Sequence, residues 1–123
     1  MKLHPDKATS LNTFTGYGEG FVEVNARRHD GGLVMMPQGP VHPWPVDGFE
    51  ALTAEHFDAL AGHGPELVLL GTGARQRFPH PSLLRGLASR RIGVEAMDTR
   101  AACRTYNILM TEGRQVLIAL LPE

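Results

Sequence analysis

Arginines and hydroxyl residues gather where two predicted strands of this chain end. The segment Gly71-Thr72-Gly73-Ala74-Arg75-Gln76-Arg77 follows one buried strand, and Met97-Asp98-Thr99-Arg100 follows the next. In an open α/β sheet, ligands usually bind beyond the carboxyl ends of the strands. If the two strands run side by side in parallel, these side chains share one edge. Guanidinium and hydroxyl donors there would suit a carboxylate or a phosphate.

A polar stripe continues from this edge along the predicted helix that follows. Arg100, Arg104, Asn107 and Thr111 are spaced at i, i+4, i+7 and i+11, so they share one helical face. Two arginines in the first half of a helix oppose its dipole, at a cost of about 0.3–1 kcal/mol each. Neighbouring carboxylates could compensate as ordinary ion pairs, and a bound anion could do the same. The candidate edge for an anion or a partner comprises Gly71, Thr72, Gly73, Arg75, Arg77, Asp98, Thr99, Arg100, Arg104 and Asn107.

The spacing of Gly71 and Gly73 also resembles part of a nucleotide-binding turn. Gly71-x-Gly73 follows a strand, but Gln76 stands where the third glycine belongs. The connection to the next helix is long, and two prolines interrupt it. A lone Gly-x-Gly is weak support for a dinucleotide site, because glycine also lets a chain turn sharply off a strand. We therefore expect no cofactor.

Metal-binding and nucleophilic residues have ordinary explanations. The six histidines include no i, i+4 pair on a predicted helix, and Cys103 is the only cysteine, so we expect no metal site. His80, between two prolines, is the one histidine that could act as an acid or base. Ser82 lies where a helix cap belongs, and Cys103 fits a small buried thiol. No catalytic residue is identified, and catalysis stays open, with a non-enzymatic role favoured.

The proline-rich segment 37–48 holds the one tryptophan of the chain. Trp44 stands in Val41-His42-Pro43-Trp44-Pro45-Val46. It could anchor a partner protein, since Trp is enriched at interaction hot spots. It could also cover the edge of the core, which is where large aromatic side chains usually lie. The sequence favours the core and leaves the anchor open.

The elements that would position these residues divide the chain in two. Strand patterns at 11–17, 21–25 and 33–36, with a turn at 27–32, predict an N-terminal β-meander over about residues 10–37. Residues 53–121 alternate helix-like and buried strand-like segments, and this βαβαβ pattern predicts an α/β layer. Thr53 and Asp98 or Thr99 fit as helix caps, and Gly62 as the stop of the first helix.

Length and composition narrow the class of protein. A chain of 123 residues has room for one domain, so we expect a single domain over 1–123. The net charge of −1 argues against nucleic-acid binding or adsorption to an anionic membrane as the main role. The chain has no apolar run of membrane-spanning length and no second cysteine, and we expect no targeting segment. We therefore expect a cytoplasmic location and no membrane insertion.

Several segments in order carry a family resemblance. They are Glu66–Gly73, Gly93–Thr99, Ala101–Asn107 and Glu112–Arg114, and weaker similarity runs back through 33–37 and 43–45. Together they resemble the small uncharacterised domain family that includes mitochondrial complex I assembly factor 3 and the adipogenesis-associated domain protein. The resemblance implies a three-layer α/β fold with a central mixed sheet and an added β portion. It supplies no catalytic residue.

Two functions follow as hypotheses. The resemblance favours a non-enzymatic, assembly-factor-like module that binds a protein partner of unknown identity. The arginine-rich edge favours a small-anion or phosphometabolite-binding protein, which could be an enzyme. The oligomeric state stays open.

Overall fold

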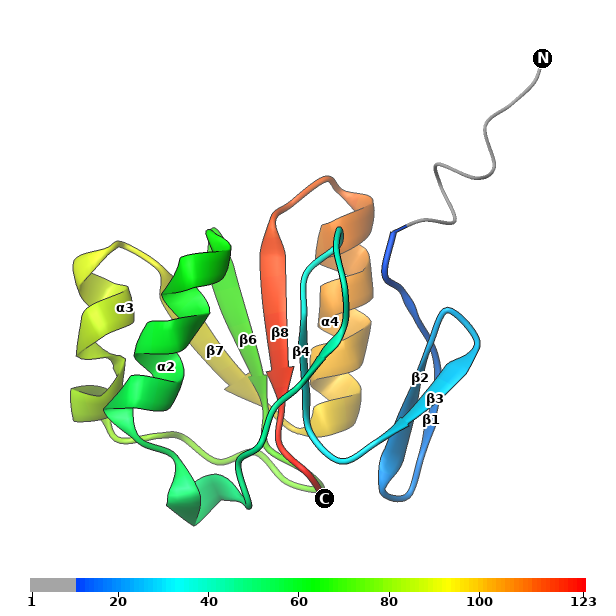
Figure 1. Cartoon of the computed structure of the whole chain (residues 1–123), viewed down its shortest axis with the longest axis horizontal. Helices are drawn as coiled ribbons and strands as arrows, with labels where there is room; N and C mark the ends of the chain where they lie inside the picture. Colours follow the sequence, from blue (N-terminus) through cyan, green and yellow to red (C-terminus); the bar gives the residue numbers. More distant parts are fainter. Residues whose placement is uncertain (1–10) are drawn as a thin grey trace.

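A five-stranded mixed sheet forms the centre of the molecule in the computed structural model, which describes residues 11–123 (Figure 1). Its strand order is β5-β4-β8-β6-β7. The strands are β4 (Leu33–Met35), β5 (His42–Pro43), β6 (Leu67–Gly71), β7 (Gly93–Met97) and β8 (Val116–Leu120). β6 runs parallel to β7 and β8, whereas β4 is antiparallel to β8 and β5.

Helices cover both faces of this sheet. Two helices, α2 (Ala54–Leu60) and α3 (Arg85–Ser89), lie on one face, and α4 (Thr99–Thr111) lies on the other (Figure 1). Short 3-10 helices lead into or out of them: η1 (Phe49–Ala51), η2 (Ala61–His63) and η3 (Pro81–Leu84). The predicted three-layer α/β fold with a central mixed sheet is confirmed.

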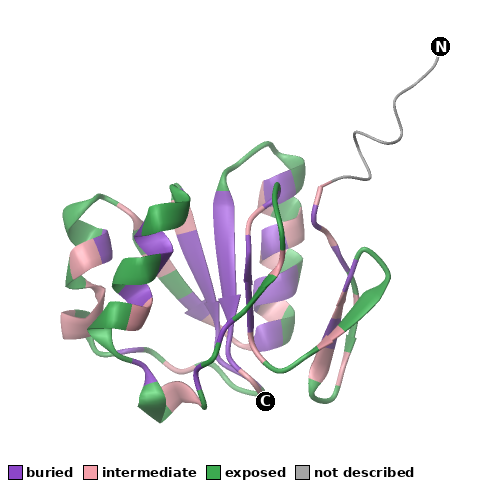
Figure 2. Cartoon of the chain, viewed as in Figure 1, coloured by how far each residue is buried: buried purple, intermediate pink, exposed green. Residues whose placement is uncertain are grey.

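The core occupies both faces of the sheet because its inner strands alternate between them. In β8, Val116, Ile118 and Leu120 pack toward α4, whereas Leu117 and Ala119 pack toward α2 and α3. All five are buried, so β8 is covered on both faces along its whole length (Figure 2). Such double burial explains why these segments read as continuous apolar runs rather than alternating ones.

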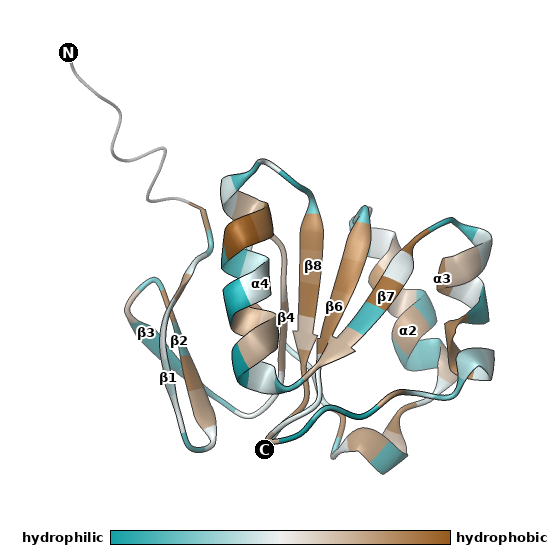
Figure 3. Cartoon of the chain, turned by 180° about the vertical axis from the view of Figure 1, so that it is seen from behind, coloured by the Kyte–Doolittle hydropathy of each residue, from teal (hydrophilic) through white to brown (hydrophobic). Residues whose placement is uncertain are grey.

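A three-stranded antiparallel meander lies beside α4, apart from the main sheet (Figure 3). It consists of β1 (Phe14–Gly18), β2 (Phe21–Val24) and β3 (Arg27–Asp30). Residue 10, the expected start of the meander, lies outside the described residues. Two details of the prediction are wrong: residues 27–30 form a strand rather than a turn, and the segment 33–36 contributes β4 to the central sheet.

Both errors are explained by how far each strand is buried: β3 is mostly exposed, and β4 is fully buried. β3 contains no apolar residue and is an exposed edge strand, so it has no hydrophobic alternation to detect. Asn25 and Ala26 both have positive φ, as a two-residue hairpin turn requires, and they return the chain into β3. The whole of β4 is buried, which is typical of an inner strand of a two-sided sheet.

Capping residues determine where the helices begin. The Thr53 hydroxyl accepts a hydrogen bond from the His56 amide, and the His56 ring accepts one from the Thr53 amide (3.3 and 3.0 Å). The carboxylate of Asp98 caps α4. The predicted stop at Gly62 is wrong, because the chain continues through η2 and turns at Gly64, whose φ is 71°. Only at Gly64 does the backbone enter the left-handed region, where glycine is favoured.

Candidate functional site

The loops that follow β6 and β7 lie side by side at the carboxyl edge of the sheet. The Thr72 amide donates to the Met97 carbonyl (2.8 Å), and the Gly73 amide donates to the Thr99 hydroxyl (3.0 Å). The Thr99 amide returns a hydrogen bond to the Gly73 carbonyl (2.9 Å). The two segments named from the sequence therefore form one continuous corner.

The polar groups of this corner bond one another. The Thr72 hydroxyl donates to the Arg75 carbonyl (2.7 Å) and accepts from the Arg77 amide (3.1 Å). Asp98 accepts from a backbone amide in the first turn of α4, and both Thr72 and Thr99 are buried. Gly71 is needed for packing, since a Cβ there would lie 2.3 Å from a Leu120 methyl carbon. These residues hold the corner together and present few free donors.

The four arginines of the candidate edge separate into two pairs. Arg77 bonds Glu50 at 2.6 Å and stacks over Phe49 at 4.2 Å from the ring centroid, which holds the pKa of the Glu50 carboxyl below its usual value. Arg75 and Arg77 line a hollow of about 310 Å³ beside η1. Arg100 and Arg104 lie instead on α4, on the side of the meander.

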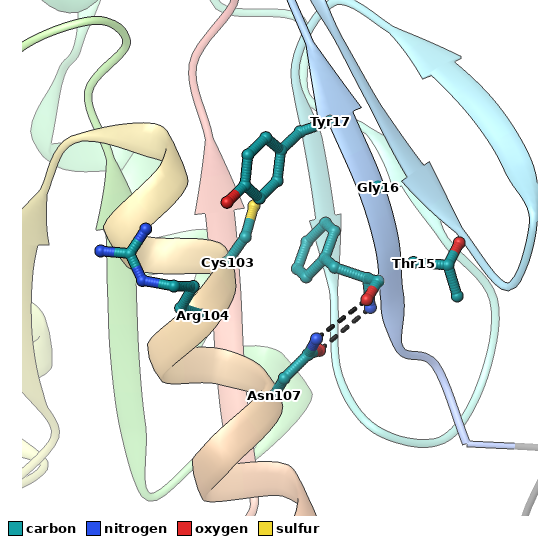
Figure 4. A pocket seen from close by; sticks show the side chains of 7 residues that line it. Thr15, Gly16, Tyr17, Cys103, Arg104 and Asn107 are labelled. Carbon is teal, nitrogen blue, oxygen red and sulfur yellow. Dashed lines mark hydrogen bonds between the residues drawn. The ribbon is translucent and has the colours of Figure 1, made fainter.

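A groove of about 410 Å³ lies between α4 and β1 (Figure 4). We call it the α4–β1 groove. Three residues of α4 and four of β1 line it: Cys103, Arg104 and Asn107, with Phe14, Thr15, Gly16 and Tyr17. The side chain of Asn107 points to the strand, whereas Arg104 extends along the outer side of the helix (Figure 4).

Two neighbouring residues of α4 fix the strand that forms the far wall. Asn107 binds both backbone groups of Phe14: its amide nitrogen donates to the carbonyl (2.9 Å), and its amide oxygen accepts from the N–H (3.0 Å). The Tyr106 hydroxyl donates to the Asn12 carbonyl (2.9 Å), and the Tyr106 ring meets Phe14 edge-on at 5.3 Å. Asn107, a candidate ligand from its spacing, therefore positions the meander.

Next to the groove, the exposed side of α4 carries positive charge without a carboxylate partner among the described residues, together with an exposed apolar side chain. Within residues 11–123, neither Arg100 nor Arg104 has a carboxylate within 4.0 Å. The Arg100 guanidinium lies 5.0 Å from the Tyr17 ring centroid, and Tyr17 and Ile108 are 38% and 59% exposed. We call these four residues the α4–β1 surface. Sequence reasoning missed Ile108, although it extends the i, i+4 spacing of the two arginines, and it missed Tyr17, whose strand is remote in sequence.

The possible nucleophiles are occupied or buried. Cys103 is 1% exposed, and burial raises the pKa of its thiol to about 12, so the thiol stays protonated near neutral pH. A protonated thiol is a poor nucleophile. The His80 ring accepts from the Ser82 amide (3.1 Å) and lies 2.8 Å from its hydroxyl, so His80 rather than Ser82 caps η3.

Trp44 lies in the core. It is 8% exposed and packs in the cluster on the α2 side of the sheet, with its ring 6.3 Å from that of His56. This position matches the expected core cover and leaves little of the indole accessible to a partner.

Residues 11–123 offer neither a metal centre nor a membrane-spanning helix. No group of three His, Cys, Asp or Glu side chains is arranged to hold a metal ion in this range. None of its helices has both the length and the apolar character needed to cross a membrane.

Comparison with known proteins identifies the family. The model of the family described as "Protein of unknown function (DUF498/DUF598)" matches residues 14–121. The chain belongs to this family. Because the match begins with β1, the α4–β1 groove lies wholly within the DUF498/DUF598 domain.

Relatives carry an assembly-related name. The chain is 40% identical over 105 residues to the Bos taurus protein named NADH dehydrogenase [ubiquinone] 1 alpha subcomplex assembly factor 3, covering 84% of this chain and 56% of that one. It is 46% identical to the Danio rerio protein of the same name, covering 99% and 71%. The chain thus spans about half the length of the first curated relatives it matches.

A solved structure matches the fold closely. The crystal structure of a Bordetella parapertussis protein superposes with a TM-score of 0.89 at 50% identity, covering 94% of this chain and 99% of that one. The family resemblance derived from the sequence motifs is confirmed, and so is the fold that it implies.

Proposed function

We propose that this DUF498/DUF598 domain is a non-enzymatic binding module that helps to assemble a multi-subunit complex. In this proposal the α4–β1 surface holds an acidic segment of a partner protein. The relatives named as assembly factors support the general role. The single observation that carries the site is the pair of unpaired arginines beside the exposed Tyr17 and Ile108.

The geometry of this pair suits a carboxylate. Residues four apart on a helix have neighbouring side chains, so Arg100 and Arg104 can bind one acidic side chain or two adjacent ones. Arginine gives planar, bidentate contacts with carboxylates, and Arg and Tyr are enriched among the residues that dominate binding energy. Tyr17 and Ile108 would add apolar contact on either side of the charges. The whole chain has a net charge of −1, so the attraction is local to this surface.

A free small anion finds less support at the corner between β6 and β7. Thr72, Thr99 and Asp98 use their side chains on backbone groups of the corner itself. Arg77 is already paired with Glu50. An anion there would have to compete with these internal bonds, whereas a carboxylate at the α4–β1 surface displaces none.

A crosslinking experiment with charge reversal tests the proposal. A photo-crosslinking amino acid at position 108 should capture a partner in cells, and sequencing of the crosslinked peptide should show Asp or Glu next to the captured site. Arg100→Glu and Arg104→Glu should each weaken binding of that purified partner about tenfold, which corresponds to about 1.4 kcal/mol. Arg90→Glu is the matched control, because Arg90 is exposed at the end of α3, on the other face of the sheet.

Two results would contradict this function. The first is a captured segment without acidic residues. The second is binding that Arg100→Glu and Arg104→Glu leave at the level of Arg90→Glu. Because exposed ion pairs are screened by salt, binding should also weaken between 0.05 and 0.5 M salt, to an extent on the order of tenfold.

A further inference from the structure

The sheets of residues 11–123 end in four edge strands, and three of these are protected against pairing with another chain. β3 is the charged sequence Arg27–Asp30, and β5 is two residues long and includes Pro43. β1 has a register irregularity between Phe14 and Gly16, and the Asn107 side chain occupies its outer backbone groups at Phe14. Charge, proline, shortness and bulges are the usual means by which proteins block edge strands.

The fourth edge strand, β7, has a largely open edge. The Met97 carbonyl faces β6, because it accepts from the Thr72 amide at the end of that strand. Backbone groups alternate in direction along a strand, so those of Val94 and Ala96 point away from the sheet. On this edge, the structure of residues 11–123 shows one hydrogen-bond partner: the Gln76 side chain donates to the Ala96 carbonyl (2.8 Å).

A groove of about 380 Å³ runs along this open edge. Its apolar wall includes Phe78, Pro79 and Leu84, and Phe78 is 72% exposed. Leu84 and Val94 are partly buried and pack against the core cluster on the α2 side of the sheet. The apolar wall therefore lies toward that face.

The opposite face of β7 carries one carboxylate, that of Glu95. Glu95 is the one charged residue in the lining of the groove, and it is exposed. Side chains alternate along a strand, so Glu95 faces the α4 side, opposite to Val94. Figure 3 views the sheet from that side, with β7 at the edge farthest from the meander.

We propose that β7 is a second binding site, which takes an extended segment of a partner protein as an additional strand. Main-chain hydrogen bonds to Val94 and Ala96 would hold the segment, as in other cases of strand addition. The two faces of β7 determine which side chains the bound segment should carry. These are apolar residues toward Phe78 and Leu84, and a Lys or Arg opposite Glu95. The site is separate from the α4–β1 surface, which lies across the sheet on the side of the meander.

Hydrogen exchange with peptide probes tests this site directly. The first probe is a heptapeptide in which valine alternates with threonine and the central position is lysine; the second has glutamate at the centre. At a concentration that occupies about 90% of the protein, the lysine probe should slow exchange of the Val94 and Ala96 amides about tenfold, because only the free fraction exchanges. The Glu95 amide, which faces β6, is the internal control.

Matched variants separate this site from others. Phe78→Ser should weaken binding of the lysine probe about fivefold by removing an apolar contact. Ile108→Ser removes another exposed apolar side chain (59% exposed, against 72% for Phe78) at the distant α4–β1 surface, and it should leave binding of the lysine probe unchanged. Glu95→Arg should reverse the preference between the two probes. Neither Phe78 nor Glu95 is buried, so these variants are expected to fold.

Three outcomes would overturn the proposal. One is unchanged exchange at Val94 and Ala96 with both probes. Another is an equal effect of Phe78→Ser and Ile108→Ser on binding. The third is protection of the two amides that increases with protein concentration in the absence of peptide, which would make a second copy of this chain the occupant. None of these three measurements depends on Arg100 or Arg104. If Arg100→Glu and Arg104→Glu left partner binding unchanged, the proposed function would be refuted, and the test of the β7 site would be unaffected.

Discussion

Asn107→Ala should detach the start of β1 from α4. The substitution removes two hydrogen bonds to Phe14, whose side chain is 6% exposed. Each bond contributes about 1 kcal/mol, and stranding partly buried backbone groups adds to the cost. We expect a loss of about 2–3 kcal/mol in the free energy of unfolding. The Tyr106 hydroxyl still binds Asn12, so the variant should fold.

Urea unfolding followed by fluorescence of the buried Trp44 measures this loss, and hydrogen exchange at the Phe14 amide locates it. Asn107→Asp should lower the free energy of unfolding at least as much, because it replaces the donor to the Phe14 carbonyl with a carboxylate oxygen. Thr111→Ala is the control: its exposed hydroxyl binds only the Asn107 backbone carbonyl (2.8 Å), and we expect a change within about 0.5 kcal/mol. A loss below about 0.5 kcal/mol for Asn107→Ala, with unchanged exchange at Phe14, would refute the reasoning.

Three further predictions concern packing, capping and pH. Gly32→Ala would place a Cβ 2.7 Å from the Leu120 carbonyl and 2.9 Å from that of Trp44. It should therefore destabilise by about 1–3 kcal/mol in urea titrations, and an unchanged midpoint would contradict this packing. Asp98→Ala removes the cap of α4 and should lower the free energy of unfolding by about 1 kcal/mol in the same titrations. Asp98→Asn should keep most of the stabilisation that the cap provides. Burial raises the pKa of the Cys103 thiol from its ordinary value of 9.0 to about 12 in the folded protein. The stability that this shift provides is therefore complete below pH 9 and is lost as the pH rises toward 12. Cys103→Ala should flatten the fall in stability over this interval, and an identical slope in both proteins would contradict it.

The elements that could be predicted from the sequence are those with strong local signals. β6 and β8 are buried on both faces, so their apolar runs are continuous. Thr53 and Asp98 each bind an amide in the first turn of their helix, and such caps depend on spacing alone. β3 has no comparable signal. It is paired through its backbone to β2, and no pattern of side chains requires that pairing.

The candidate site was less predictable because it depends on which face each helix covers. The contact between the loops after β6 and β7 follows from parallel pairing, which the strand-helix order indicated. The separation of Arg77 from Arg104 depends on the loop after β6 turning to one face of the sheet and α4 covering the other. The contact between Asn107 and Phe14 joins residues 93 positions apart, and no local spacing predicts it.

The two proposed binding sites follow from how residues 11–123 treat their edge strands: three of the four are protected, and β7 is largely open. The meander protects its own edge by docking β1 on Asn107, and this docking also creates the groove beside Arg104. β7 is the last strand in the order of the five-stranded sheet of residues 11–123, on the side away from β4 and β5. If both proposals hold, a segment bound at one site would not cover the other, so one domain would be able to hold two partner segments at once. Bringing two segments together is a task that an assembly module can perform without any catalytic group.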